Sequence, residues 1–182
     1  MKLRTLRASN CAKSLGFTLV EVLVTMSVAA VLTAVAIPSF KSFLQNDRAM
    51  TQSTSLVLSL NIARSEAIKQ DISGGVAVCP STDGLTCSGA STWEQGWIVL
   101  STAAASVPTQ VVPSLSIGTK LREAANSTAV TFLSSGIVLA PAAFTLCDSR
   151  GTSQGRYIQV TATGRVASAV GKDLAGHTLV CP

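Results

Sequence analysis

A 21-residue apolar run, FTLVEVLVTMSVAAVLTAVAI from Phe17 to Ile37, limits what this chain can fold into. As a helix the run would be about 31 Å long at 1.5 Å per residue, which matches a hydrocarbon core of roughly 30 Å. Basic residues precede the run and would stay in the cytoplasm, so the rest of the chain would face outward. The run therefore predicts one membrane-spanning helix.

Most of the net positive charge lies at the N-terminal end of the chain. The formal net charge is +5, and the first 16 residues supply four of these charges from Lys2, Arg4, Arg7 and Lys13. The remaining 10 basic and 9 acidic residues nearly balance. Overall basicity is therefore weak evidence for nucleic-acid binding by the rest of the chain.

Glu21 is the single charge in the apolar run. An ordinary signal peptide has an apolar region of about 7–15 residues and an Ala-x-Ala site, and Ala34-Val35-Ala36 could serve as that site. A plain signal anchor is another reading. Neither explains an acidic group at membrane depth, which costs several kcal/mol by insertion scales and usually marks function.

Thr18, Glu21 and Thr25 share one face of the predicted helix, because they are spaced by three and four residues. A polar stripe on an apolar helix indicates packing against another helix as well as against lipid. We expect Glu21 to find a positive or hydrogen-bonding partner on a neighbouring subunit.

The stretch from Lys13 to Glu21, KSLGFTLVE, resembles the class III signal of type IV pilins and type II secretion pseudopilins. The resemblance implies that a prepilin peptidase cleaves after Gly16 and methylates the new amine of Phe17. It also implies that Glu21 pairs with the N-terminal amine of an adjacent subunit during assembly. The leader, residues 1–16, would be removed, and the helix segment 17–40 would pass from the membrane into a fibre core.

A kink or local break is expected at Pro38, which lacks an N–H and crowds the preceding turn. The helical pattern nevertheless continues from Ser39 to about Gln70, where Gly74-Gly75 predicts its end. Apolar positions recur there at spacings of four, three and four residues, at Leu56, Leu60, Ala63 and Ala67. We expect one long helix, from Phe17 to near Lys69, with an amphipathic second half.

Beyond Gly75 the sequence changes to short runs rich in Val, Ile, Thr, Ser and Gly, as is typical of strands. The expected strands are 76–79, 96–101, 130–133, 144–147, 156–161 and 165–167. In the fifth, Ile158, Val160 and Ala162 should face the core, and Thr163-Gly164 predicts a tight hairpin turn. Residues 101–128 predict a loop, with one further strand near 111–117.

The expected fold class is α+β, with the long N-terminal helix packed on a β-rich antiparallel head. The head, residues 41–182, would consist of the amphipathic helix 41–70 and the β-rich domain 71–182. Several stretches of the head are similar to the GspH/FimT group: Leu60–Ile68, Val78–Pro80, Trp93–Val99, Leu146–Gly151, Gly155–Ile158 and Thr163–Val166.

This second resemblance implies a type IV pilin-like fold and a minor pilin of the FimT/FimU kind, without a cofactor. Its partners would be other minor and major pilins and an inner-membrane assembly platform. The chain would first be a single-pass inner-membrane protein with a periplasmic head, and would then enter an extracellular pilus.

Four of the five cysteines follow the apolar run, at Cys79, Cys87, Cys147 and Cys181, while Cys11 lies in the leader. An even number beyond a membrane segment predicts two disulfides. Three pairings are possible, and loop-closure entropy favours Cys79–Cys87, which leaves Cys147–Cys181. The spacing contains no CxxC pair, so neither a zinc site nor a redox site is expected.

A cationic set near the C-terminus is the candidate DNA-binding site: Arg150, Arg156, Arg165 and Lys172. Arginines near glycines suit phosphate contacts, because glycine lets the backbone approach closely. Some FimT-like pilins take part in DNA uptake through a Gly-Arg-x-Arg motif. Here the stretch is Gly164-Arg165-Val166-Ala167, so alanine replaces the second arginine.

The remaining candidate residues have mainly structural interpretations. Arg64 and Glu66 predict a salt bridge or a solvated face, with a subunit contact as the alternative. Trp93 and Trp97 predict core packing, and His177 predicts an isolated surface histidine.

The two resemblances imply three alternative functions. The first is a minor pilin that helps to initiate type IV pilus assembly and so supports motility, adhesion or competence. The second is a pilus-borne DNA-binding subunit, and the third is a minor pseudopilin of type II secretion. An enzyme is not expected, since the sequence has no nucleophile elbow, phosphate loop or metal-binding spacing.

Overall fold

The computed structural model describes residues 16–71, 74–103 and 107–181. The predicted leader lies outside the described residues, apart from Gly16, and this includes Lys2, Arg4, Arg7, Cys11 and Lys13. The chain divides into two compact units, one ending at Ser42 and one running from Phe43 onward.

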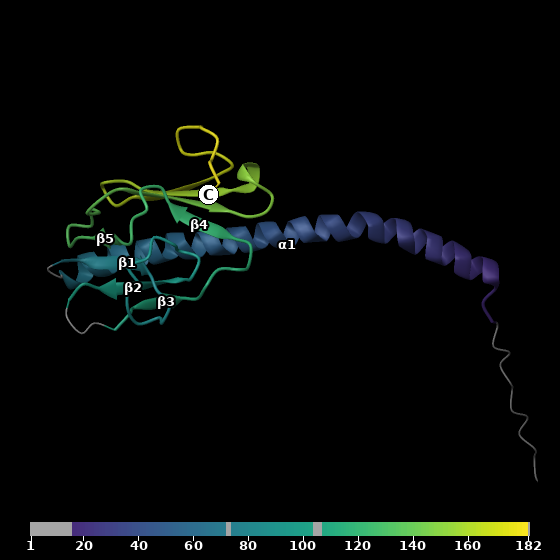
Figure 1. Cartoon of the computed structure of the whole chain (residues 1–182), viewed down its shortest axis with the longest axis horizontal. Coiled ribbons are helices and arrows are strands. Elements are labelled where there is room, and N and C mark those ends of the chain that lie inside the picture. Colours follow the sequence, from purple (N-terminus) through teal and green to yellow (C-terminus); the bar gives the residue numbers. More distant parts are fainter. Residues whose placement is uncertain (1–15, 72–73, 104–106, 182) are drawn as a thin grey trace, which may run out of the picture. The chain divides into compact units, whose positions relative to one another are not determined.

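A single helix, α1, extends from Leu19 to Gln70 and passes through both units (Figure 1). Its bounds confirm the long helix expected from the sequence. Pro38 lies inside this continuous helix, so the local break that was expected there does not occur. A proline removes one backbone hydrogen bond, and the turns on either side retain theirs. The helix ends where Asp71 adopts a left-handed conformation, with φ of 46°.

The described residues of the head form two four-stranded sheets, and every strand pair among them is antiparallel (Figure 1). The first sheet has the order β3-β2-β1-β5, built from β1 (Val76–Pro80), β2 (Trp97–Ser101), β3 (Gln110–Val112) and β5 (Val130–Phe132). The second has the order β4-β6-β7-β8, built from β4 (Lys120–Glu123), β6 (Ala142–Cys147), β7 (Arg156–Val160) and β8 (Val166–Val170). A short 3-10 helix, η1 (Thr152–Gln154), joins β6 to β7.

The second half of α1 and both sheets share one hydrophobic core. The stripe predicted on the helix is confirmed, since all four of its apolar residues are buried: Leu56, Leu60, Ala63 and Ala67. Trp93 and Trp97 are fully buried, which confirms their packing role. The ring of Trp93 meets Phe144 edge to face, with centroids 4.8 Å apart, a favourable aromatic geometry.

The strand predictions needed four main corrections, the first being that β3 ends at Val112 and does not extend to residue 117. β4 was expected to be loop, because its charges at Lys120, Arg122 and Glu123 hid the strand pattern. β8 extends to Val170, beyond the expected end at Ala167. Ala162 is exposed in the β7–β8 turn and does not face the core. This turn contains Gly164 at φ 75°, a left-handed conformation that glycine adopts readily.

Candidate functional site

The N-terminal end of α1 begins with a hydrogen-bonded cap. Thr18 precedes the helix, and its Oγ1 accepts a hydrogen bond from the Glu21 N–H at 3.2 Å. This satisfies one of the backbone donors that the first turn of a helix leaves free. Gly16 and Phe17 lie before the helix and are exposed, so the bond between them lies outside regular structure.

The first part of α1 is long and apolar enough to cross a membrane. Its most apolar window has a mean hydropathy of 2.3, and none of that window is buried. The hydroxyls in this part bond to their own backbone, as when Thr25 donates to the Val22 carbonyl and Thr33 donates to the Ala29 carbonyl. Glu21 differs, because no described residue bonds its carboxylate.

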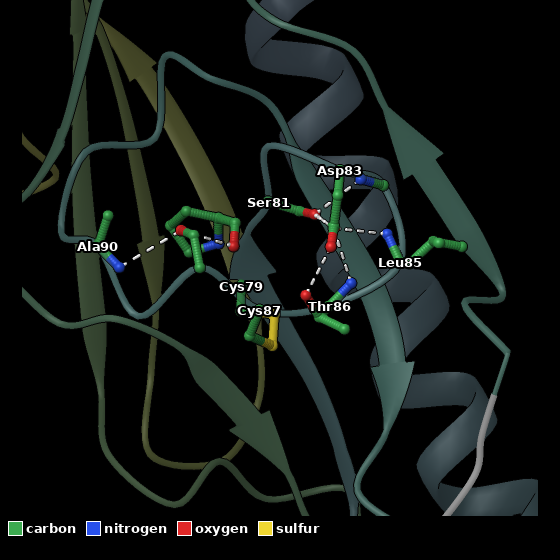
Figure 2. Close-up of a disulfide and its surroundings, with 10 residues drawn as sticks. Cys79, Ser81, Asp83, Leu85, Thr86, Cys87 and Ala90 are labelled. Carbon is green, nitrogen blue, oxygen red and sulfur yellow. Dashed lines mark hydrogen bonds between the residues drawn. A yellow bond between two sulfur atoms is a disulfide. The ribbon is translucent and has the colours of Figure 1, made fainter.

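Both disulfides form in the head: Cys79–Cys87 and Cys147–Cys181. The first closes a short loop after β1, and Figure 2 shows Asp83 at the centre of that loop. Its carboxylate accepts hydrogen bonds from the backbone N–H groups of Thr86 and Leu85 and from the hydroxyls of Thr86 and Ser81. These bonds hold the pKa of Asp83 well below its usual range. The loop is therefore closed by the disulfide and capped by the Asp83 carboxylate.

The second disulfide ties the C-terminal arm, residues 171–181, to the end of β6. Within this arm His177 is exposed but not isolated, since its Nδ1 lies 2.9 Å from Asp173 Oδ2. The bond from the His177 side chain lowers the pKa of Asp173. Tyr157 on β7 lines one cavity with Asp173 and Leu179 of the arm, and its pKa is raised by burial and by Asp173.

The candidate DNA-binding cations do not form one exposed group. Arg150 pairs with Asp148, with its Nη2 2.6 Å from Asp148 Oδ2. Arg156 donates to Asn46 Oδ1 on α1 at 2.8 Å. Arg165 and Lys172 are exposed, and no described residue bonds their side chains.

The register of β7 and β8 separates Arg165 from the other three cations. Arg156 pairs with Val170 at one end of the ladder, whereas Val160 pairs with Val166 at the other. Four residues of strand span about 13 Å. Lys172 therefore lies just beyond the end of β8 that pairs with Arg156. Arg165 lies beside the hairpin turn, at the opposite end of β8.

Arg64 takes a role that the sequence did not predict. Its Nε donates to the Gly136 carbonyl at 3.0 Å and its Nη2 donates to the Thr163 carbonyl at 3.1 Å. Neither expected reading, a salt bridge or a solvated face, describes these bonds. Glu66 bonds Lys69 and Gln70 on its own helix. Arg64 therefore fastens two turns of the head to α1.

Two carboxylates on or near β4 have roles that the sequence did not predict. Glu123 is buried, and it accepts hydrogen bonds from the backbone N–H groups of Ala125, Ser127 and Ala143. Glu94 pairs with Arg122. Partial burial raises the pKa of Glu94, but its hydrogen bonds, chiefly from Arg122, outweigh that effect and lower the pKa overall. Nothing in the local sequence indicated that Glu123 would be buried or that Glu94 would pair with Arg122.

The described residues contain no cluster of three or more side chains suited to hold a metal ion. The features of this chain are an apolar helix with one acidic group and a disulfide-bonded antiparallel head. Together they define a type IV pilin-like subunit.

Comparison with known proteins agrees with this class. Residues 52–164 match the model of the family described as type II transport protein GspH, and residues 11–37 match the prokaryotic N-terminal methylation motif. The chain belongs to the GspH family, whose members are pilin-like structural subunits and not enzymes. No curated protein matches the sequence.

The fold is similar to crystal structures of the type IV minor pilin FimU from Pseudomonas aeruginosa. The structure in space group P21 has 20% sequence identity and a TM-score of 0.56, with 69% of this chain and 90% of that chain covered. The structure in space group P65 has 22% identity and a TM-score of 0.50, with 65% and 91% covered. These similarities confirm the expected fold class.

Proposed function

We propose that this chain is a minor pilin that helps to initiate type IV pilus assembly. In this proposal a prepilin peptidase cleaves between Gly16 and Phe17 and methylates the Phe17 amine. The residues from 17 to 40 then hold the subunit in the inner membrane, with its head in the periplasm. Other pilins and the assembly platform draw it into an extracellular pilus.

The observation that carries the proposal is the carboxylate of Glu21, which no described residue bonds, in an exposed apolar helix. A charge at membrane depth is costly unless it is paired. The hydroxyls of Thr25 and Thr33 bond their own backbone, so Glu21 is the group that needs a partner. The methylated amine of Phe17 on an adjacent subunit would supply the opposite charge.

The proposal can be tested by complementing a strain that lacks this chain. Glu21→Gln removes the charge, and Thr33→Val is a matched control that removes a hydroxyl already bonded within the helix. We expect Glu21→Gln to accumulate as cleaved protein in the membrane while surface pili fall severalfold, and Thr33→Val to resemble the wild type. Normal pilus counts with failed protein secretion would instead support a type II secretion pseudopilin.

A second candidate, binding of DNA by the head, is favoured only by the exposure of Arg165 and Lys172. Arg150 and Arg156 make bonds within the head. The test is titration of the full chain with duplex DNA at two salt concentrations, alongside Arg165→Gln/Lys172→Gln. Salt-sensitive binding that the variant loses would support a DNA receptor, because phosphate contacts release counterions. Absence of binding at low salt would exclude it.

A further inference from the structure

Three of the four outer strands in the head are poorly suited to pair with another chain. Short strands, charges and proline all discourage pairing at a sheet edge. β3 has only three residues and is followed by Pro113. β4 carries three charged residues, and Thr92 bridges to it at Arg122.

β5 is also protected. It has three residues, and Val138 bridges to it at Phe132. The Leu139 N–H donates to the Thr131 carbonyl at 2.8 Å, which uses a backbone group on its outer side. The segment that follows β5 therefore covers its edge.

β8 has none of these protections. Its sequence, VASAV from Val166 to Val170, contains no charge, glycine or proline. It has five residues and forms the outer strand next to β7. Ser168 and Val170 are exposed. Natural sheets usually protect such an edge, because its unpaired N–H and C=O groups can pair with another chain.

The backbone groups that face outward can be assigned from two hydrogen bonds. The Thr161 N–H donates to the Arg165 carbonyl at 3.0 Å, and the Gly171 N–H donates to the Gly155 carbonyl at 2.9 Å. Hydrogen-bonded pairs alternate in an antiparallel ladder, so residues 167 and 169 also bond to β7. The N–H and C=O groups of Val166, Ser168 and Val170 therefore point away from β7.

No other described segment bonds these outward groups. Free donors and acceptors at alternate residues of a strand match one kind of ligand, an extended polypeptide that adds a further strand. A five-residue strand offers a contact of about 17 Å.

The charges beside β8 specify what this polypeptide should carry. Arg165 precedes the strand and Lys172 follows it, and both side chains are exposed without a partner among the described residues. A second copy of β8, paired antiparallel about Ser168, would place Arg165 of each copy next to Lys172 of the other. Like charges this close repel one another, even though the two side chains would point to opposite faces of the sheet. Self-pairing is therefore disfavoured, and a different chain with acidic ends is favoured.

We propose that the free edge of β8 binds an extended segment of a partner protein, uncharged at its centre and acidic at both ends. This contact is separate from the apolar helix, and it does not depend on whether the chain serves a pilus or a secretion system. It gives the head a directional bond to one neighbour, in addition to helix packing.

The test uses the full chain in detergent micelles and amide hydrogen exchange measured by NMR. The probe is the peptide Glu-Thr-Val-Thr-Val-Thr-Glu, and the same peptide with lysine at both ends is its charge control. Without peptide, the amides of Val166, Ser168 and Val170 should exchange faster than those of Ala167 and Ala169. The acidic peptide should slow the first three by tenfold or more, and the lysine peptide should not.

Two variants make this test specific to the edge. Ser168→Pro removes an outward N–H and leaves the β7–β8 hydrogen bonds intact, so it should abolish protection without changing the unfolding midpoint. Ser168→Thr is the matched control and should bind as the wild type does. Three results would overturn the proposal: equal exchange at all five amides, no protection at millimolar acidic peptide, or undiminished protection in Ser168→Pro.

Discussion

The indole N–H of Trp97 donates to Ser59 Oγ at 2.9 Å, and both residues are fully buried. The Ser59 hydroxyl donates in turn to the Ser55 carbonyl, also at 2.9 Å. One hydroxyl thus links β2 to the second half of α1 inside a core that is otherwise almost wholly apolar.

Ser59→Ala should lower the free energy of unfolding by about 1–3 kcal/mol, because the buried indole N–H loses its acceptor. Urea unfolding of the full chain in detergent, followed by tryptophan fluorescence, measures the change. Thr54→Ala, at an exposed position on the same helix, should stay within about 0.5 kcal/mol of wild type. Equal stability of the two variants would mean that the Trp97 bond contributes nothing.

Gly164→Ala should be more destabilising than Gly89→Ala. Both glycines have positive φ, 75° and 70°, so each variant incurs a left-handed penalty of about 1–2 kcal/mol. A methyl group at Gly164 would also lie 2.1 Å from the Gly136 carbonyl oxygen that Arg64 binds, whereas at Gly89 nothing lies within 4 Å. We expect an additional loss of about 1–3 kcal/mol at Gly164. The same urea titration compares them, and a Gly89 variant as unstable as the Gly164 variant would refute the close contact.

The Cys147–Cys181 disulfide should stabilise the head more than Cys79–Cys87 does. Their sequence separations are 34 and 8 residues. The chain-entropy relation assigns them about 4 and about 2.5 kcal/mol respectively. Paired Cys→Ser variants of each disulfide, compared by urea unfolding, should reproduce that order. A larger loss from the short loop would show that Asp83 and its hydrogen bonds depend on the Cys79–Cys87 link.

The folded head should become less stable in acid, partly because the Asp148 carboxylate becomes protonated. Partial burial raises the pKa of Asp148, but hydrogen bonds from the Arg150 side chain and backbone outweigh it and lower the pKa overall. A lowered pKa gives stability that is complete above the unfolded value of about 3.9 and is lost as pH falls through the folded value.

Unfolding midpoints between pH about 5 and about 2 measure this acid dependence. Other acids with lowered pKa values contribute as well, so the informative quantity is the difference between wild type and Asp148→Asn. The wild type should lose its advantage over Asp148→Asn as the pH drops below about 4. A constant difference over the whole range would assign the Asp148–Arg150 pair no role in acid stability.

The helix and its buried stripe could be predicted from the sequence, because the spacing of apolar residues indicates which face of a helix is buried. Leu56 and Ala63 illustrate this, since both were predicted to be buried and are fully buried. The class of protein could also be predicted, since the segment around Gly16 and Glu21 carries a specific motif that the family comparison confirms.

What could not be predicted depends on contacts between distant segments. Arg64 bonds carbonyls 72 and 99 residues away, and no local pattern specifies such partners. Arg156 likewise bonds Asn46 across 110 residues, so an arginine that looked available for DNA is engaged within the head. The sequence left three disulfide pairings open for a similar reason, since loop-closure entropy alone is a weak discriminator.

The most direct test of the proposed function is mass spectrometry of pili sheared from cells that produce this chain. A processed minor pilin should give an N-terminal peptide that begins at Phe17 and carries one added methyl group. An N-terminus at Ile37, after the Ala34-Val35-Ala36 site, would identify an ordinary signal peptide and contradict the pilin account. An intact leader on all of the protein would contradict it as well.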